Sequence, residues 1–342
     1  MNTINCFKLG ITLAGVLALI VVPTSADTFG TTGNEFTIDF VDIGNAGNAD
    51  DAGAGGGSYF SPYGGVSYTY RMGTYEISQN AITNATASGL TNVNAGSFAG
   101  NRPAADMTWY EAAAFVNWLN TSTGHQAAYD LAFAGNWSMT LWSSAQAWQA
   151  GGENLYRHKD AYYFLPSEDE WYKAAYHQND GVTANYWDYA TGSNTVPTSE
   201  LTGGTLAGSA VYDGTTPGTP AGPADVNLAG GLSAYLTMGQ NGNVYEWQES
   251  AFDGSNSSSS EERGIRGGRW NTYEDNLRIR ALNAPSSSEI GLGFRVASVP
   301  EPSSAILLAS GLICLLNRCR ARSENFQHGN IRLQNRRARV LI

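Results

Sequence analysis

The sequence predicts an α+β domain with little regular secondary structure. Two short segments have the caps and apolar spacing of helices, and several others alternate like short strands. Between them, residues 179–234 are rich in Gly, Thr and Pro, which is more irregular chain than a compact domain usually contains. All nine tryptophans lie within residues 27–299, so we expect aromatic packing, more than long helices or strands, to stabilise the fold.

The first 26 residues are predicted to be a secretory signal peptide. Lys8 is the single charge before an apolar run from Leu9 to Val22, and the small residues of Pro23–Ala26 follow. The run has 14 residues, whereas a membrane-spanning helix needs roughly 20. A cleaved signal is therefore favoured over a membrane anchor, and we expect the protein to be exported.

Residues 27–65 are expected to form an N-terminal strand and a Gly-rich loop. Phe36–Ile43 alternates apolar and polar side chains, as a half-buried strand does, and Gly44–Gly57 has the composition of a loop. Val66–Ile77 is predicted to form a hairpin of strands around Gly73.

The strongest helix signal covers Thr108–Leu119. Thr108 can cap the helix, and Glu111 three residues later completes a capping box. One apolar face is predicted at helical spacing, from Ala112, Phe115, Val116 and Leu119.

A second helix is predicted at Ser167–Tyr176. Ser167 can cap it, and the acidic residues Glu168–Glu170 favour the positive end of the helix dipole. Short strands are expected from Met238 to Val296.

Charge and cysteine content restrict the function of residues 27–299. This span holds 11 basic and 28 acidic residues, a net charge of −17, which disfavours nucleic acids and anionic membrane surfaces as partners. Neutral polymers, cations and basic proteins remain as possible partners. The alternative is that the acidic charge serves only to keep an exported protein soluble. The three cysteines, Cys6, Cys314 and Cys319, all lie outside the span, so the domain is expected to be stable without disulfides.

The C-terminal residues 299–322 resemble a PEP-CTERM sorting signal. Val299–Pro302 contains Pro-Glu-Pro, Ala305–Leu316 is apolar, and three arginines follow, Arg318, Arg320 and Arg322. The resemblance implies a membrane segment processed by an exosortase-type enzyme, and a final location at the cell envelope, the surface or the extracellular matrix. The basic tail 323–342 departs from this pattern, because such signals normally end soon after the basic cluster. A buried C-terminal helix is the alternative.

An ordered series of short motifs resembles the formylglycine-generating enzyme family, also called sulfatase-modifying factors. The motifs are Asn101–Pro103, Met107–Ala112, Phe164–Trp171, Gly242–Trp247, Arg266–Trp270 and Gly293–Arg295. The likeness covers about residues 66–297, so the domain is taken as residues 66–298. It implies a C-type-lectin-like α+β fold, with few helices around a small twisted antiparallel sheet.

Several motif residues are interpreted as structural. We expect Arg295 to form a buried ion pair instead of contacting a ligand. Four tryptophans are predicted to anchor the core, namely Trp109, Trp171, Trp247 and Trp270.

The chemistry that the resemblance implies is not matched by this chain. The family's enzymes oxidise a sulfatase cysteine to formylglycine, and they resemble copper enzymes in which two cysteines bind Cu(I). Those positions correspond to Thr272 and Leu277, with Asn276 as the alternative to Leu277. Thiolates suit Cu(I), and none is present, so no copper is expected. The domain's histidines, His125, His158 and His177, lack metal-ligand spacing, so no catalytic residue is assigned.

The sequence leaves two interpretations of the turn at Gly242–Trp247, a calcium site or a turn held by hydrogen bonds. The resemblance implies a structural calcium ion held by the carbonyls of Gly242 and Val244 and by the carboxylate of Glu246. Gly239 stands where the family usually has a further Asn or Asp ligand. The alternative is that Glu246 accepts hydrogen bonds from backbone amides of its loop.

The favoured function is an exported, non-catalytic binding or structural module at the cell surface or in the matrix. Its ligand would be a polysaccharide or a protein, bound at a surface around Tyr245, Trp270 and Tyr273. The alternatives are an oxidoreductase of the formylglycine-generating family and an iron-dependent relative.

Overall fold

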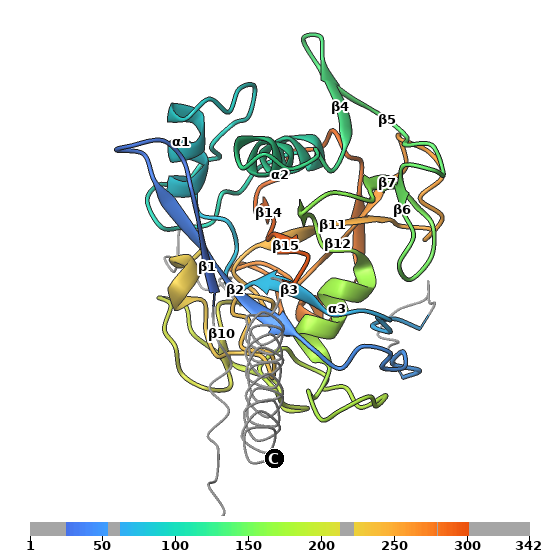
Figure 1. Ribbon diagram of the computed structural model, residues 1–342. Coiled ribbons are helices and arrows are strands. Elements are labelled where there is room, and N and C mark those ends of the chain that lie inside the picture. The colour runs from blue at the N-terminus through green and yellow to red at the C-terminus, as the bar shows by residue number, and fades with distance from the viewer. Residues whose placement is uncertain (1–24, 54–61, 213–221, 279, 301–342) are drawn as a thin grey trace, which may run out of the picture.

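The computed structural model describes residues 25–53, 62–212, 222–278 and 280–300 (Figure 1). Residues 1–24 of the predicted signal sequence 1–26, the tail from residue 301 and part of the Gly-rich loop lie outside the described residues. Ser25 and Ala26 are described and begin the first strand. Within the described part of the chain, no helix combines the length and apolarity needed to cross a membrane.

The five-stranded sheet joins the two ends of the domain. Its order is β1-β2-β3-β15-β8, and all neighbouring strands are antiparallel. Because β2 pairs with β3, residues 27–65 and 66–298 share this sheet. β2 has the bounds predicted from its alternation. The strands are β1 (Ser25–Phe29), β2 (Phe36–Ile43), β3 (Tyr70–Gly73), β8 (Tyr163–Phe164) and β15 (Ala297–Ser298).

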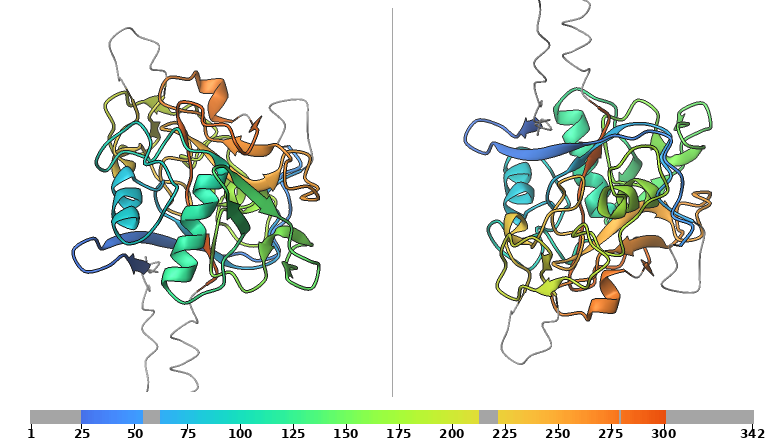
Figure 2. Two further views of the ribbon diagram at one scale, coloured as in Figure 1. Left: turned by 90° about the horizontal axis from the view of Figure 1, so that it is seen from above. Right: turned by 90° about the horizontal axis from the view of Figure 1, so that it is seen from below.

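The predicted hairpin at Val66–Ile77 is wrong. Only β3 is a strand there, and it pairs with β2 and β15 instead of folding back on itself. The amide of Gly73 donates to the carbonyl of Val296 at 2.7 Å. The chain then enters helix α1 (Gln79–Ala87), which is capped by Ser78. Both views in Figure 2 show α1 beside the β1–β2 hairpin.

The two predicted helices are confirmed. In α2 (Trp109–Ser122) the hydroxyl of Thr108 accepts from the amide of Glu111, whose carboxylate accepts from the amide of Thr108. Helix α3 (Glu168–Tyr176) has the same capping box between Ser167 and Glu170. The predicted apolar face of α2 is fully buried.

A second sheet of four strands crosses the middle of the domain (Figure 1). Its order is β13-β12-β11-β14, and the β11–β14 pair is parallel while the others are antiparallel. The strands are β11 (Tyr245–Ala251), β12 (Arg263–Arg266), β13 (Ala281–Asn283) and β14 (Leu292–Gly293).

The remaining elements are short. The β4–β5 hairpin extends away from the body in Figure 1. Residues 179–234 hold little regular structure, as predicted. These elements are β4 (Asp130–Phe133), β5 (Trp137–Thr140), β6 (Ala147–Trp148), β7 (Asn154–His158), β9 (Thr198–Ser199), β10 (Ser209–Ala210), and the 3₁₀ turns η1 (Val226–Leu228) and η2 (Glu274–Leu277).

The core lies between α2 and the two sheets, and tryptophans tie it to the backbone. Trp109 Nε1 donates to the carbonyl of Gln248 at 3.0 Å, and Trp247 Nε1 donates to that of Met107 at 2.9 Å. Both rings are fully buried, as are Trp171 and nearly all of Trp270, so the four predicted anchors are confirmed. Few helices and curled, mainly antiparallel sheets make this the expected C-type-lectin-like α+β fold.

Candidate functional site

The turn at Gly242–Trp247 positions the first carboxylate of the candidate site. Gly242 has φ +83°, and a Cβ there would lie 2.0 Å from the carbonyl of Val211, so only glycine fits. Asn243 follows in the left-handed region at φ 58°. The chain then enters β11 with Glu246 facing the interior.

Glu246 is held by a buried arginine. Arg295 Nε donates to Glu246 Oε2 at 2.6 Å and Arg295 Nη2 to Oε1 at 2.6 Å, while Trp171 Nε1 donates to Oε2 at 2.8 Å. All three side chains are fully buried. The predicted ion pair of Arg295 is confirmed, and it links the motifs at residues 164–171, 242–247 and 293–295.

The side chains of this turn do not fit a calcium ion as they lie. The guanidinium of Arg295 already engages both carboxylate oxygens of Glu246, and a second positive charge beside it would be repelled. Among the described residues, no group of three or more His, Cys, Asp or Glu side chains is arranged to hold a metal. Calcium binding through Gly242, Val244 and Glu246 stays a prediction.

A second buried carboxyl, Glu76, lies close to this turn. Its Oε2 accepts from Asn243 Nδ2 at 2.7 Å, while Oε1 has no partner in the described part of the chain. Burial raises the pKa of Glu76 well above its usual range, and the nearby charge of Glu246 raises it further. A Cβ on Gly239 would come within 2.9 Å of Glu76, which explains the glycine where the family usually has a ligand.

The two positions that match the family's cysteines do come together. A Cβ on Gly268 would lie 3.2 Å from both Thr272 Oγ1 and Leu277 Cδ2. Thr272 Oγ1 donates to the carbonyl of Arg269 at 2.9 Å, and Leu277 is fully buried in an apolar cluster. A hydroxyl and an isobutyl group, with Asn276 beside them in η2, do not fit Cu(I), which prefers thiolates.

The expected ligand surface is only partly exposed. Trp270 is 5% exposed and packs edge-to-face on Phe98 with 5.3 Å between ring centroids, so it cannot offer its face to a sugar. Tyr245 is half-buried. Tyr273, at 63% exposed, is therefore the one freely accessible ring of the three.

The histidines lie apart and serve in packing. His125 stacks on Tyr162 with centroids 4.5 Å apart. His158 packs edge-on against Trp142, and His177 contacts the hydroxyl of Tyr235 at 3.1 Å.

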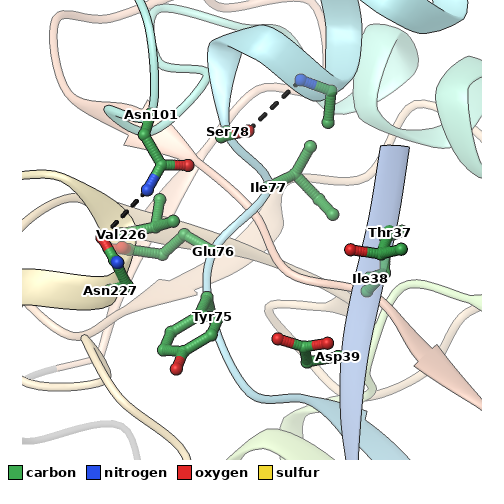
Figure 3. A pocket seen from close by; sticks show the side chains of 11 residues that line it. Thr37, Ile38, Asp39, Tyr75, Glu76, Ile77, Ser78, Asn101, Val226 and Asn227 are labelled. Atoms are coloured by element: carbon green, nitrogen blue, oxygen red, sulfur yellow. Dashed lines mark hydrogen bonds between the residues drawn. The ribbon is translucent and has the colours of Figure 1, made fainter. Parts of the chain in front are cut away.

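A hollow of about 220 Å³ opens between β2, the segment before α1 and the η1 turn (Figure 3). The sequence analysis did not predict it, because its residues come from separate, short segments without a common motif. Asn101 Nδ2 donates to Asn227 Oδ1 at 2.9 Å at its edge. Its polar lining comes from Thr37, Asp39, Tyr75, Glu76, Ser78, Asn101 and Asn227, and its apolar lining from Ile38, Ile77, Ala81 and Val226.

Comparison with known proteins identifies the fold and the family. The family model described as the sulfatase-modifying factor enzyme 1-like domain matches residues 48–299. No curated protein matches the sequence.

Solved structures show the same architecture. Treponema denticola variable protein 1 is similar, with 22% identity and a TM-score of 0.54 over 80% of this chain and 99% of that chain. CarF is similar at 17% identity and a TM-score of 0.54, over 77% and 99% of the two chains. PvdO from Pseudomonas aeruginosa gives 15% identity and a TM-score of 0.47, over 80% and 98%. At these identities the first two likenesses show the fold alone.

Proposed function

Because this chain belongs to the sulfatase-modifying factor enzyme 1-like family, we propose that it is a member that binds a ligand without carrying out the family's oxidation. One observation carries the proposal. The paired positions where the resemblance implies copper-binding cysteines hold Thr272 and Leu277, and residues 27–299 contain no cysteine that could replace them.

The buried hydrogen bonds of the motif residues support a structural role for them. Arg295 and Trp171 occupy the carboxylate of Glu246, and Leu277 fills its own position with an apolar side chain. A side chain committed to buried hydrogen bonds is costly to release for catalysis. The buried hydrogen bonds of Glu246, Arg295 and Trp171 therefore serve to hold the fold.

The proposed location is the cell surface or the extracellular matrix. The predicted signal sequence at residues 1–26 supports export. The resemblance of residues 299–322 to a sorting signal supports tethering to the membrane until an exosortase-type enzyme processes it. The charge of −17 over residues 27–299 argues against nucleic acid as a ligand. A polysaccharide is the proposed ligand, and a surface protein is the alternative.

Binding of the purified full-length protein to a panel of bacterial polysaccharides tests this proposal. We expect at least one polymer to bind, and a parallel series with a calcium chelator tests whether binding needs an ion at Gly242, Val244 and Glu246. A control melting curve would show that the protein stays folded under both conditions. Folded protein that binds no polymer would contradict the proposal.

A further inference from the structure

The hollow between β2 and η1 adjoins the turn considered for calcium, because Glu76 lines it and accepts from Asn243. None of Gly242, Glu246, Thr272 and Leu277 lines it. Its volume of about 220 Å³ is smaller than the ~300–1,000 Å³ of sites for drug-sized molecules. It is therefore suited to a single small ring or a short chain.

Several polar groups of this hollow are free to bind a ligand. In the described part of the chain, the carboxylate of Asp39 and the hydroxyl of Tyr75 have no hydrogen-bond partner. Glu76 also lines the hollow, but it is only 3% exposed and its Oε1 is buried. Asp39 and Tyr75 are half-buried, so a ligand in the hollow can reach both side chains.

The charge of the hollow selects the ligand further. Its described lining includes no Lys or Arg, and Asp39 carries its negative charge, since the raised pKa of Glu76 favours the neutral form of that side chain. Asp39 and Tyr75 both line the hollow (Figure 3), and burial first and then the Asp39 carboxylate raise the pKa of Tyr75. A carboxylate beside an aromatic ring attracts a cation through both charge and cation–π contact. An anionic ligand such as a phosphate would be repelled.

The opposite edge of the hollow suits hydroxyl groups. The amide nitrogen of Asn101 donates to Asn227, which leaves the oxygen of Asn101 and the nitrogen of Asn227 to pair with a ligand. Figure 3 shows these two amides on one side and Asp39 with Tyr75 on another. A small ring that carries both an amine and several hydroxyls matches both edges.

We propose that this hollow binds one hexosamine unit of a glycan whose amino group is free and positively charged. The ammonium group lies against Asp39, the sugar ring packs on Tyr75, and ring hydroxyls reach Asn101 and Asn227. This inference rests on the proposed function, which is polysaccharide binding, and it names the class of glycan that is bound. The net charge of −17 over residues 27–299 favours such a polycationic polymer at longer range.

Isothermal titration of the full-length protein with glucosamine oligomers tests the proposal. N-acetylglucosamine oligomers of equal length serve as the comparison. The titrations are run at about 0.15 M salt, where the Debye length is ~8 Å and distant charges are screened. We expect the free-amine oligomer to bind at least about tenfold more tightly, which is the loss expected when one charge-assisted hydrogen bond is removed.

Two variants separate the hollow from the general charge of the surface. Asp39→Asn removes a carboxylate without an intramolecular partner, so it should fold normally and lose about tenfold in affinity. Asp42→Asn makes the same charge change at an exposed position of the same strand, outside the hollow, and should bind like the wild type. Equal affinities of the Asp39→Asn variant and the wild type would overturn the assignment, as would equal binding of N-acetylated oligomers.

Lysine oligomers test the sugar part of the proposal. We expect Asp39→Asn to weaken their binding less than that of glucosamine oligomers, because they lack the ring hydroxyls that reach Asn101 and Asn227. An equal loss would overturn the hexosamine assignment. Binding of a different polysaccharide regardless of Asp39 would refute this site and leave the proposed function standing. Failure of every polymer to bind would refute both.

Discussion

Arg157 lies between two buried carboxylates and joins three parts of the domain. Its Nη2 donates to Glu170 Oε2 at 2.8 Å and to Glu249 Oε2 at 2.7 Å. Both acids are fully buried, and Glu170 also closes the capping box of α3. The two carboxylates hold the pKa of Arg157 well above its usual range despite the opposing effect of burial. One cation thus connects β7, α3 and β11.

We predict that Arg157→Met destabilises the protein by about 3–5 kcal/mol, because it leaves two carboxylates buried without a cation. Chemical unfolding monitored by tryptophan fluorescence measures this change. Arg278→Met is the matched control, since Arg278 forms a half-exposed ion pair with Asp188 at 3.4 Å and should cost at most about 1 kcal/mol. Equal losses in the two variants would contradict the account.

Asp169 predicts a pH dependence of stability. Burial raises its pKa from 3.8 to about 7, and Glu168 and Asp50 add to this against the bond from the amide of Gly64. Between these two pH values the folded protein keeps a proton that the unfolded chain has lost. Stability therefore falls as the pH rises through this window.

The variant Asp169→Asn should remove this pH effect, because the amide oxygen still accepts from Gly64 without becoming charged. We expect its melting temperature to exceed that of the wild type by a margin that grows from pH 5 to pH 8. Asp130→Asn, at an exposed position of β4, should show no such trend. A margin that stays constant with pH would rule out this explanation.

The structural role of a residue could be predicted from the sequence where the residue belongs to a recognisable motif. The ion pair of Arg295 and the four buried tryptophans followed from the motifs around them. The partners Glu76 and Glu249 were missed, because a lone Glu in a strand or turn looks like a solvated residue in the sequence. Their burial depends on chain segments up to 167 residues away, as in the bond from Asn243 to Glu76.

At the level of elements, the helix caps of α2 and α3 are the clearest link between sequence and structure. In α2 the carboxylate of Glu111 also accepts from the amide of Asn94 at 2.9 Å, so the cap anchors a neighbouring loop. The box therefore fixes both the start of the helix and the path of the chain before it.

Replacement of Thr108 by Ala should cost about 1 kcal/mol of unfolding free energy, because the amide of Glu111 loses its acceptor. Urea denaturation measures this. Thr121→Ala near the exposed end of the same helix should change stability by at most about 0.5 kcal/mol. A Thr108 variant as stable as the Thr121 variant would show that the box is not needed.

Elements without local signals could not be read from the sequence. Helix α1 was missed because Asn and Thr, which are weak helix formers, make up much of its sequence. The hairpin around Gly73 was predicted from alternation, but alternation does not tell which strand is the partner. β3 pairs with β2 and with β15, which lies more than 200 residues later.

At the scale of the whole molecule, a single sheet closes the domain by pairing its first strands with its last. This closure and the tryptophan core account for a fold without disulfides. The overall fold could be predicted because the motifs came in the family's order, whereas the hollow beside β2 could not, since it forms only where distant loops meet.

The most direct measurement of the central claim is a peptide oxidation assay. The full-length protein is incubated with copper, oxygen and a sulfatase peptide that contains Cys-x-Pro-x-Arg, and the peptide is analysed by mass spectrometry. A relative that retains both cysteines serves as the positive control. We predict that the peptide cysteine stays unchanged, because Thr272 and Leu277 cannot bind Cu(I). Formylglycine produced in proportion to the amount of this protein would contradict the account.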